Sequence, residues 1–337
     1  MRYLIISNGC GAGHAVRDLV LADEIRRRSD GAEIYFASYA AGLSVFHSIG
    51  ETVIDLKQEE RPDPDVIGKV LSRVIKEVHP DVLISDEVIA ALGHDRTIKT
   101  YFLTNHLNIY EYSYAYWVCE SILFAELPDS LGSLLQDRKK IRTIGPIVRE
   151  RFDIPDLTVS EPSDQCLHVW VGGSQLKALQ LENIWLFKNL FEQLDNRKIY
   201  VHGIEYERFF RKVSLPNVFW VERDYSQKPY QQGVQITRGG IQTLWEMALT
   251  GAACIAVPYS DKVNPQEIKY AKVMEKRDLC KLVQYQDIRE KRLKEVVEEV
   301  EAAKSVKYSR YLQNRGYQLV LSCRNEWEAW MSEITQQ

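Results

Sequence analysis

The sequence lacks an excess of either charge, and its cysteines are not arranged in pairs. Its 337 residues contain 43 Lys and Arg against 47 Asp and Glu, which gives a formal net charge of −4. Domains that bind nucleic acid through bulk charge usually carry a basic excess, so we expect no nucleic-acid partner. The six cysteines include no C-x-x-C pair, which argues against a zinc cage or a disulfide framework.

Long apolar runs are also missing. The first apolar run covers residues 3–6, whereas the core of a signal peptide needs roughly 7–15 apolar residues. No stretch approaches the roughly 20 apolar residues of a membrane-spanning helix. These absences favour a cytoplasmic protein. At about 150 residues per domain, the chain length predicts two domains.

The sequence also lacks two common nucleotide-binding motifs. The glycine-rich turn at 9–13 follows a predicted strand, but His14 stands where the dinucleotide fingerprint has its third glycine. Ser38 and Tyr39 follow the next predicted strand, where that fingerprint has an acidic residue. The spacing does not match the GxxxxGK[ST] phosphate loop either. A nicotinamide dehydrogenase and a P-loop ATPase are therefore disfavoured.

Strands and helices alternate along both halves of the chain, which predicts parallel sheets with helices on both faces. Apolar runs predict strands at 3–6, 33–37, 81–85, 167–171, 198–201, 218–221, 234–237 and 253–257. The polar, proline-bearing segment 151–164 interrupts the pattern and predicts a linker. The charge-rich stretch 289–304 predicts a solvated helix, and 308–334 predicts a helical end.

We therefore expect an α/β fold with two Rossmann-like doubly wound domains. The N-terminal domain covers 1–150, the linker 151–164 and the C-terminal domain 165–337. In such folds a ligand binds at the carboxyl ends of the strands, so we expect the two domains to face one another across a cleft.

His14 is the first candidate catalytic residue. Gly11 and Gly13 lie in the turn before it and would let a ligand approach the backbone. Because the positive end of a helix disfavours imidazolium, we expect His14 to be neutral at pH 7 and able to accept a proton. The alternative is that His14 only caps the helix; we favour the catalytic interpretation.

Two glycine turns in the second half are candidate phosphate sites. Gly173, Ser174 and Gln175 follow one predicted strand, and backbone amides with a hydroxyl at a helix start suit a diphosphate. Gly239 and Gly240 form the second turn. The signal from each turn is weak, because most αβ connections contain such turns.

The helix after the second turn allows two interpretations. We expect it to begin near Thr243, and Thr243-x-x-Glu246 has the spacing of a capping box. In the functional alternative, the Glu246 carboxylate accepts hydrogen bonds from a ribose diol. On spacing alone the capping box is favoured.

Three further segments have less specific patterns. Asn264, Gln266 and Glu267 follow the strand at 253–257 and suit sugar hydroxyls, or form an ordinary polar loop. Asp63-Pro64-Asp65 matches the DxD motif of metal-dependent transferases, but the prolines before a helix favour a helix cap, so we expect no metal. The aromatic segment 107–127 could be an acceptor groove or a membrane-docking face; a helix packed in its domain is favoured.

Together, these motifs resemble those of MurG-like glycosyltransferases of the GT-B fold, in the same order and over most of the chain. GCGAGH at 9–14 looks like the GGTGGH loop of that family, and HPDVLISD at 79–86 is similar to its "PDvvisd" strand. IGPIVR at 144–149 resembles "vGnPvR", and VGGSQ at 171–175 resembles the VGGSQ loop. The segment 237–246 resembles "SRSGAxTxxE", and 258–266 resembles the following "P…Q" loop.

The resemblance implies inverting, metal-independent transfer of a sugar, with an amino sugar as the expected type, from a UDP-sugar to an unknown acceptor hydroxyl. No cofactor besides this donor substrate is implied. The resemblance also implies that the last helix of the chain can cross back onto the N-terminal domain, so the domain boundary need not be a single cut. His14 would be the general base. The implied donor-binding residues are Gly11, Gly13, Arg149, Gly173, Ser174, Gln175, Arg238, Gly239, Gly240, Thr243, Glu246, Asn264, Gln266 and Glu267. Among them, Glu246 would hold the ribose, and Asn264, Gln266 and Glu267 would face the sugar. The family has paired glutamines where this chain has Gln266-Glu267, which leaves the sugar open.

Two alternatives remain. GHAVRDLVLA at 13–22 is very similar to a motif of the UDP-sugar hydrolases of pseudaminic acid biosynthesis, in which water replaces the acceptor. The second alternative is a catalytically inactive protein that binds a nucleotide-sugar. Peripheral membrane contact through the aromatic segment remains open, as does the oligomeric state.

Overall fold

The chain divides into two compact units. A computed structural model describes residues 1–60, 62–131, 135, 138–149, 166–172, 176–222 and 233–336. Unit 1 comprises Met1–Phe152 and Leu319–Gln337, and unit 2 comprises Asp153–Gln318. The expected linker at 151–164 lies outside the described residues.

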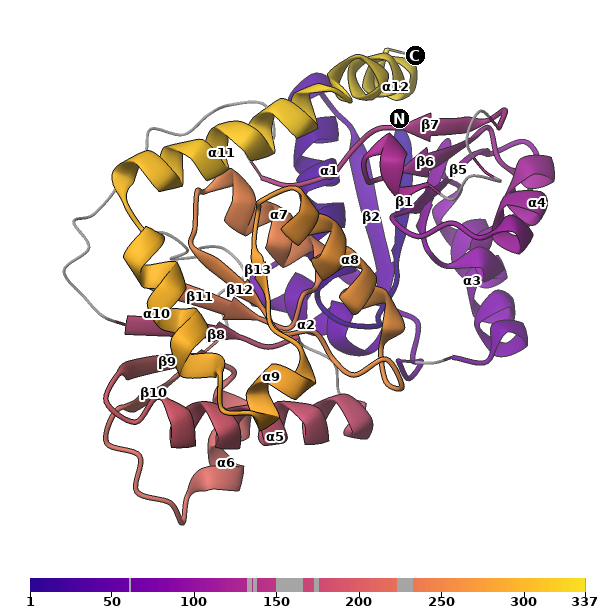
Figure 1. The fold of residues 1–337 in the computed structure, drawn as a ribbon. Helices are drawn as coiled ribbons and strands as arrows, with labels where there is room; N and C mark the ends of the chain where they lie inside the picture. The colour runs from indigo at the N-terminus through magenta and orange to yellow at the C-terminus, as the bar shows by residue number, and fades with distance from the viewer. Residues whose placement is uncertain are drawn as a thin grey trace. The chain divides into compact units, whose positions relative to one another are not determined.

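Unit 1, with the two ends of the chain, is built on a parallel sheet (Figure 1). The described strands of this sheet follow the order β3-β2-β1-β4-β5-β6-β7. The strands are β1 (Arg2–Ser7), β2 (Glu33–Ser38), β3 (Val53–Asp55), β4 (Val82–Asp86), β5 (Lys99–Thr104), β6 (Ser121–Phe124) and β7 (Ile141–Thr143). The helices are α1 (Gly13–Arg28), α2 (Ala40–Ser48), α3 (Pro64–Val78), α4 (Ile109–Val118) and α12 (Arg324–Thr335). The strand order reverses between β1 and β4, so the loops that leave these two strands diverge and leave room for a ligand.

The C-terminal helix α12 belongs to unit 1. The Tyr3 hydroxyl on β1 donates to the carbonyl of Ile334 at 2.6 Å. Arg28 on α1 pairs with Glu328 at 2.8 Å, and Trp330 is fully buried. The apolar side chains of the last helix are therefore part of the N-terminal core, although they lie at the other end of the chain.

Unit 2 has a second parallel sheet, with its described strands in the order β10-β9-β8-β11-β12-β13. The strands are β8 (Cys166–Trp170), β9 (Lys198–His202), β10 (Val218–Val221), β11 (Val234–Thr237), β12 (Cys254–Ala256) and β13 (Lys281–Leu282). The helices are α5 (Lys177–Gln193), α6 (Glu207–Phe210), α7 (Ile241–Leu249), α8 (Pro265–Lys276), α9 (Tyr285–Arg289), α10 (Leu293–Ala303) and α11 (Val306–Leu321). Here the order reverses between β8 and β11. The expected α/β fold class with two Rossmann-like sheets is confirmed.

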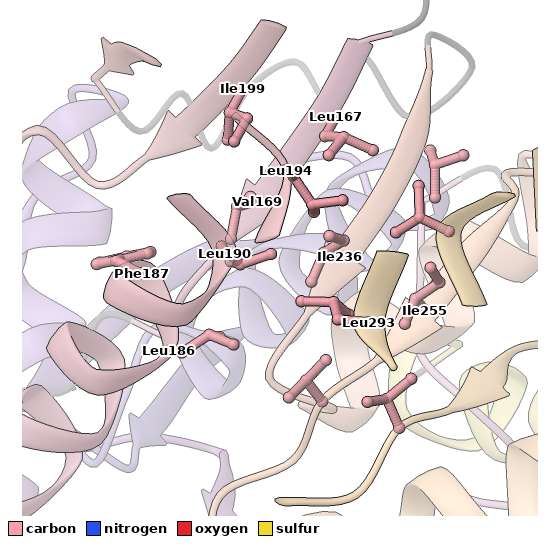
Figure 2. Packing of buried hydrophobic residues seen from close by; sticks show 14 of the residues in the cluster. Leu167, Val169, Leu186, Phe187, Leu190, Leu194, Ile199, Ile236, Ile255 and Leu293 are labelled. Atoms are coloured by element: carbon pink, nitrogen blue, oxygen red, sulfur yellow. The ribbon is translucent and has the colours of Figure 1, made fainter. Parts of the chain in front are cut away.

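The core of unit 2 shows why these segments form these elements. Alternate residues of β8, Leu167 and Val169, lie on one face of the sheet and pack with Leu186 and Leu190 of α5 (Figure 2). Every second residue of a strand lies on the same face of the sheet, and residues four apart lie on the same face of a helix, so these two pairs can pack together. Each fully buried leucine of this kind contributes about 1.5–3 kcal/mol through removal of apolar surface from water.

Helix α10 corrects one expectation. The stretch 289–304 was expected to be solvated, but Leu293, Val296, Val297 and Val300 are buried in the core of unit 2. Their spacing of i, i+3, i+4 and i+7 places them on one helix face. The numerous charges occupy the remaining faces.

Helix α3 confirms the cap interpretation of the DxD-like segment. The Asp63 side chain accepts hydrogen bonds from the backbone N–H groups of Asp65 at 2.9 Å and Val66 at 3.3 Å, and Pro64 is the first helical residue. The two aspartates are therefore explained by helix initiation.

Helix α4 is packed on one side only. Tyr112 and Ala115 are buried, as expected for a helix of the domain core. Tyr110 and Trp117, however, are 85% and 79% exposed, and Tyr114 is 45% exposed. Among the described residues, no helix combines the length and the apolarity needed to cross a bilayer.

Candidate functional site

The glycine turn after β1 brings His14 to the first turn of α1. The turn is tight, because a Cβ on Gly9 would lie 2.2 Å from the carbonyl oxygen of Tyr39. Helix α1 begins at Gly13, and its N-cap residue Ala12 provides no side-chain cap. Gly11 adopts a φ of 85°, which favours glycine. His14 is therefore not the helix cap, and its imidazole is available for other contacts.

The imidazole of His14 lies between two carboxylates. Its Nδ1 is 3.1 Å from Oδ2 of Asp86, and its Nε2 is 3.7 Å from Oε2 of Glu87. The His14 side chain is 17% exposed, whereas that of Asp86 is fully buried. An Nδ1–H that donates to Asp86 leaves the lone pair on Nε2, the atom that would accept a proton.

The strand order explains how these residues meet. Asp86 ends β4 and lies opposite Ser7, the last residue of the neighbouring strand β1. Glu87 follows with a φ of 55°, a left-handed conformation that is uncommon for residues other than glycine. Its Oε1 accepts hydrogen bonds from the Thr104 hydroxyl at 2.9 Å and the Asn105 N–H at 3.0 Å. Strain held in place by such bonds is typical of functional sites.

Arg17 is the third charged partner in this group. Its side chain is buried, its Nε donates to Oδ2 of Asp86 at 3.2 Å, and its Nη2 donates to Oδ1 of the same residue. The same Nη2 lies 3.2 Å from Nδ1 of His14. Burial alone would raise the pKa of Asp86, but Arg17 and His14 hold that pKa below its usual range. Asp86 is therefore an anion at neutral pH.

The pKa of His14 moves in the direction opposite to the expectation. Burial lowers this pKa, but the nearby carboxylates of Asp86 and Glu87 outweigh burial and raise it above its ordinary value. The expectation of a lowered pKa considered only the helix end, whose field is weaker than that of two carboxylates in contact. The two carboxylates therefore stabilise the imidazolium that forms when His14 takes up a proton.

His14, Asp86 and Glu87 also offer three potential metal ligands whose donor atoms lie within 4.8 Å of one another. The Arg17 guanidinium, however, already bonds to both oxygens of Asp86. A cation placed there would compete with this fixed positive charge. The residues present fit a proton-transfer site better than a metal site.

In unit 2, the turn after β11 exposes a helix start. Helix α7 begins at Ile241, and its N-cap residue Gly240 provides no side-chain cap. Gly239 has a φ of 85°. Thr243 consequently lies inside the helix, so the capping-box interpretation of Thr243 and Glu246 is wrong. Gly240 therefore offers no side-chain acceptor to the N–H groups of the first turn.

Glu246 lies one turn further along α7 and is buried. Its Oε1 accepts a hydrogen bond from Nε2 of Gln242 at 3.3 Å. A buried carboxylate costs free energy unless partners compensate it. The capping role is excluded, and the ribose interpretation of Glu246 stays a prediction.

Arg238, expected at the donor, instead points into the domain. It is 2% exposed, its Nη2 bonds to Oε2 of Glu182 at 3.2 Å, and its guanidinium lies 4.0 Å from the centre of the Tyr259 ring. Its Nε and Nη1 have no hydrogen-bond partner among the described residues. Arg238 therefore packs inside unit 2 and stabilises the segments that contain Glu182 and Tyr259.

The expected sugar loop begins helix α8. Asn264 is the N-cap residue of α8 without a side-chain cap bond, and Gln266 and Glu267 lie in its first turn. Burial raises the pKa of Glu267 to about 8, while Arg238 and a hydrogen bond from the Tyr259 backbone act in the opposite sense.

The remaining candidates divide between the units. Gly11, Gly13 and Arg149 belong to unit 1, with Arg149 in the segment after β7. Gly173, Ser174 and Gln175 lie outside the described residues. Gly172, just before them, is described: a Cβ on it would lie 3.7 Å from the Tyr259 hydroxyl.

Comparison with solved structures identifies the architecture. The MurG structure of Acinetobacter baumannii aligns with 100% of this chain and 99% of its own, at 13% identity and a TM-score of 0.57. TcCGT1 in complex with UDP aligns with 98% of each chain, at 12% identity and a TM-score of 0.62. Spinosyn rhamnosyltransferase SpnG complexed with thymidine diphosphate covers 98% of this chain and 96% of its own, at 13% identity and a TM-score of 0.62. The fold is GT-B.

The sequence comparison is narrower. Residues 229–320 match the model of the glycosyltransferase family 28 C-terminal domain. No curated protein sequence matches the chain. The matched segment contains β11, α7, β12 and α8 of the second GT-B unit. The expected likeness to MurG-like GT-B proteins is confirmed by this match and by the fold, and both support sugar transfer in general.

Four residues of these sites were not found from the sequence: Arg17, Asp86, Glu87 and Glu182. Asp86 and Glu87 directly follow a buried strand, which is a signal that could have identified them. Arg17 is one turn after His14 on α1, so the two share a helix face. Glu182 carries no signal in the sequence, because its partners come from distant loops.

Proposed function

We propose that this protein is a glycosyltransferase that moves a sugar from a UDP-sugar to an acceptor hydroxyl, with inversion and without a metal. The observation that carries the proposal is the His14–Asp86 pair at the start of α1 in a GT-B fold, at 3.1 Å. An imidazole held by a buried carboxylate is a general base of the usual kind. The family 28 match at 229–320 supports the donor half of the proposal.

The donor would bind to unit 2. The uncapped start of α7 after Gly239 and Gly240 offers backbone N–H groups and the positive helix end to a diphosphate. The Glu246 carboxylate would accept hydrogen bonds from the ribose, and Asn264 and Gln266 would contact the sugar. The GT-B structures with bound UDP and thymidine diphosphate support a nucleoside diphosphate; uracil comes from the motif resemblance.

The chemical step then balances without a further reagent. Nε2 of His14 takes the proton of the acceptor hydroxyl as its oxygen forms the bond to the anomeric carbon. The bond from that carbon to the diphosphate oxygen breaks, and UDP leaves with the electron pair. Asp86 stabilises the imidazolium that results, and the α7 helix start stabilises the charge that develops on the leaving diphosphate.

The test is incubation of the protein with a panel of UDP-sugars, including amino sugars, with and without candidate acceptor alcohols. We expect UDP release that requires an acceptor, together with a glycosylated product of inverted configuration. Equal release in buffer alone, with free sugar formed, would instead identify the hydrolase alternative. Binding without any release would identify the inactive binding protein.

The hydrolase alternative is supported by one specific observation. Arg17, part of the motif shared with the pseudaminic acid enzymes, contacts both His14 and Asp86. A site that activates water could use the same His14. We favour transfer because of the family 28 match at 229–320.

We further propose that α4 contacts a membrane surface at its periphery. Tyr110, Tyr114 and Trp117 follow one another at i, i+4 and i+7 and are all exposed. Tyrosine and tryptophan favour the bilayer interface because their rings are apolar with a polar end.

A further inference from the structure

Glu182 on α5 is a point at which several loops of unit 2 meet. The backbone N–H of Ser260 donates to its Oε2 at 2.9 Å, and the Ser260 hydroxyl donates to its Oε1. The Tyr285 hydroxyl on α9 and Nη2 of Arg238 also donate to Oε2. One carboxylate thus accepts four hydrogen bonds from three residues that are far apart in the sequence.

These partners belong to the segments that lead to the donor loops. Arg238 directly precedes the Gly239-Gly240 turn, and Ser260 lies between β12 and α8. The two segments are in contact, because a Cβ on Gly239 would lie 3.5 Å from Cβ of Pro258 and 3.6 Å from the carbonyl of Glu267. Glu182 therefore joins the turn expected at the diphosphate to the loop expected at the sugar.

Ser260 connects Glu182 to the segment that is expected to contact the sugar. Its carbonyl accepts the backbone N–H groups of Val263 at 2.9 Å and Asn264 at 3.0 Å. These bonds form the turn that starts α8 and sets the position of Asn264. Ser260 therefore bonds directly to the Glu182 carboxylate and also forms this turn.

The charges around Glu182 make the carboxylate hard to replace. Arg238 is buried, and two of its nitrogen atoms have no partner among the described residues. Without Glu182, Arg238 would lose a carboxylate partner, and an uncompensated buried charge is strongly destabilising. A neutral side chain at 182 would keep the shape of the site but would weaken the hold on the Ser260 turn, which donates two of the four hydrogen bonds.

We propose that Glu182 is a positioning residue for the donor sugar: its carboxylate fixes the Ser260 turn against Arg238, and so holds Asn264 and Gln266 where the sugar of the nucleotide donor binds. The inference rests on the proposed function of unit 2. It predicts that loss of the Glu182 charge weakens binding of the sugar portion, while the nucleoside diphosphate still binds at the start of α7.

The experiment compares two ligands in one titration series. Isothermal titration of the wild type and of Glu182→Gln is carried out with UDP and with the UDP-sugar that the wild type binds most tightly in the panel. In the variant we expect the ratio of the UDP-sugar dissociation constant to the UDP dissociation constant to rise about tenfold. The dissociation constant of UDP itself should stay within twofold of the wild-type value. Turnover should fall in parallel.

Matched variants separate positioning from general damage. Glu192→Gln, on the exposed side of the same helix, should change neither affinity. Ser260→Ala removes one of the four hydrogen bonds, keeps the backbone donor and provides the test if Glu182→Gln does not fold. It should shift the ratio in the same direction by a smaller factor.

The outcomes are distinguishable from failure of the proposed function. If the wild type binds neither UDP nor any UDP-sugar, the function assigned to unit 2 is wrong, and this inference with it. If the wild type binds both, and Glu182→Gln leaves the ratio unchanged or weakens both ligands equally, the function stands and the positioning role of Glu182 is overturned.

Discussion

Nδ1 of His14 lies 3.1 Å from Oδ2 of Asp86, although the two residues come from different segments of the first sheet. His14 starts α1 after β1, and Asp86 ends β4, the neighbouring strand. The two side chains meet because β1 and β4 are neighbours in the sheet, at the point where the strand order reverses. Five predictions follow from this pair and from the other described contacts.

Replacement of His14 by alanine should lower turnover roughly 10²–10⁴-fold, the usual contribution of general-base catalysis. Binding of the nucleotide donor should not change, because the contacts proposed for the diphosphate, ribose and sugar at α7, Glu246, Asn264 and Gln266 belong to unit 2. Steady-state kinetics and titration with UDP measure the two effects separately. Full turnover in the variant would exclude His14 as the base.

Replacement of Glu87 by glutamine should move the acid limb of the pH–rate profile to lower pH. The carboxylates of Asp86 and Glu87 raise the pKa of His14, and the base works only when His14 is neutral. Activity should therefore rise as the pH passes upward through the His14 pKa, and removal of one negative charge should lower that pKa. Glu77→Gln, exposed on α3, is the matched control and should leave the profile in place.

Replacement of Glu246 by glutamine should weaken donor binding about 10- to 100-fold, because hydrogen bonds to a charged group contribute about 1.5–3 kcal/mol. Helix α7 does not use Glu246 as part of a cap, so the melting temperature should change by little. Titration with UDP and thermal unfolding are both needed. A fall in melting temperature without loss of affinity contradicts the ribose role, and Glu298→Gln on α10 serves as the control.

Replacement of Asp63 by alanine should lower the free energy of unfolding by about 1 kcal/mol, because two backbone N–H groups at the start of α3 lose their acceptor. Asp63→Asn should retain most of the stability, since asparagine caps nearly as well. Denaturant titration gives the comparison. Catalytic activity should be the same in both variants, and a metal-dependent loss of activity would revive the DxD interpretation.

The double replacement of Tyr110 and Trp117 by serine should reduce sedimentation with vesicles that contain anionic phospholipid, because both rings are largely exposed. Turnover of soluble substrates should be retained. Tyr311→Ser, another exposed aromatic on α11, should leave sedimentation unchanged. If the wild type does not sediment with vesicles, the membrane proposal for α4 fails.

The sequence alone was sufficient for the fold class and for eight of the described strands, whereas β3, β5, β6, β7 and β13 were not predicted. Apolar runs predicted β10 and β11 with the observed bounds, and Asp63 with Pro64 predicted the start of α3. These features are local, because a strand pattern or a helix cap depends on residues within one turn or one strand. His14, Gly239 and Gly240 were also chosen from local turns at strand ends.

Only the tertiary structure decided the features that depend on distant partners. It assigned α12 to unit 1, which the family resemblance had left open, excluded the capping box at Thr243 and turned Arg238 inward to Glu182. It also reversed the expected direction of the His14 pKa, because Asp86 and Glu87 come from another strand. A pKa depends on which charges lie within a few ångströms, and that distance is set by strand order rather than by spacing along the chain.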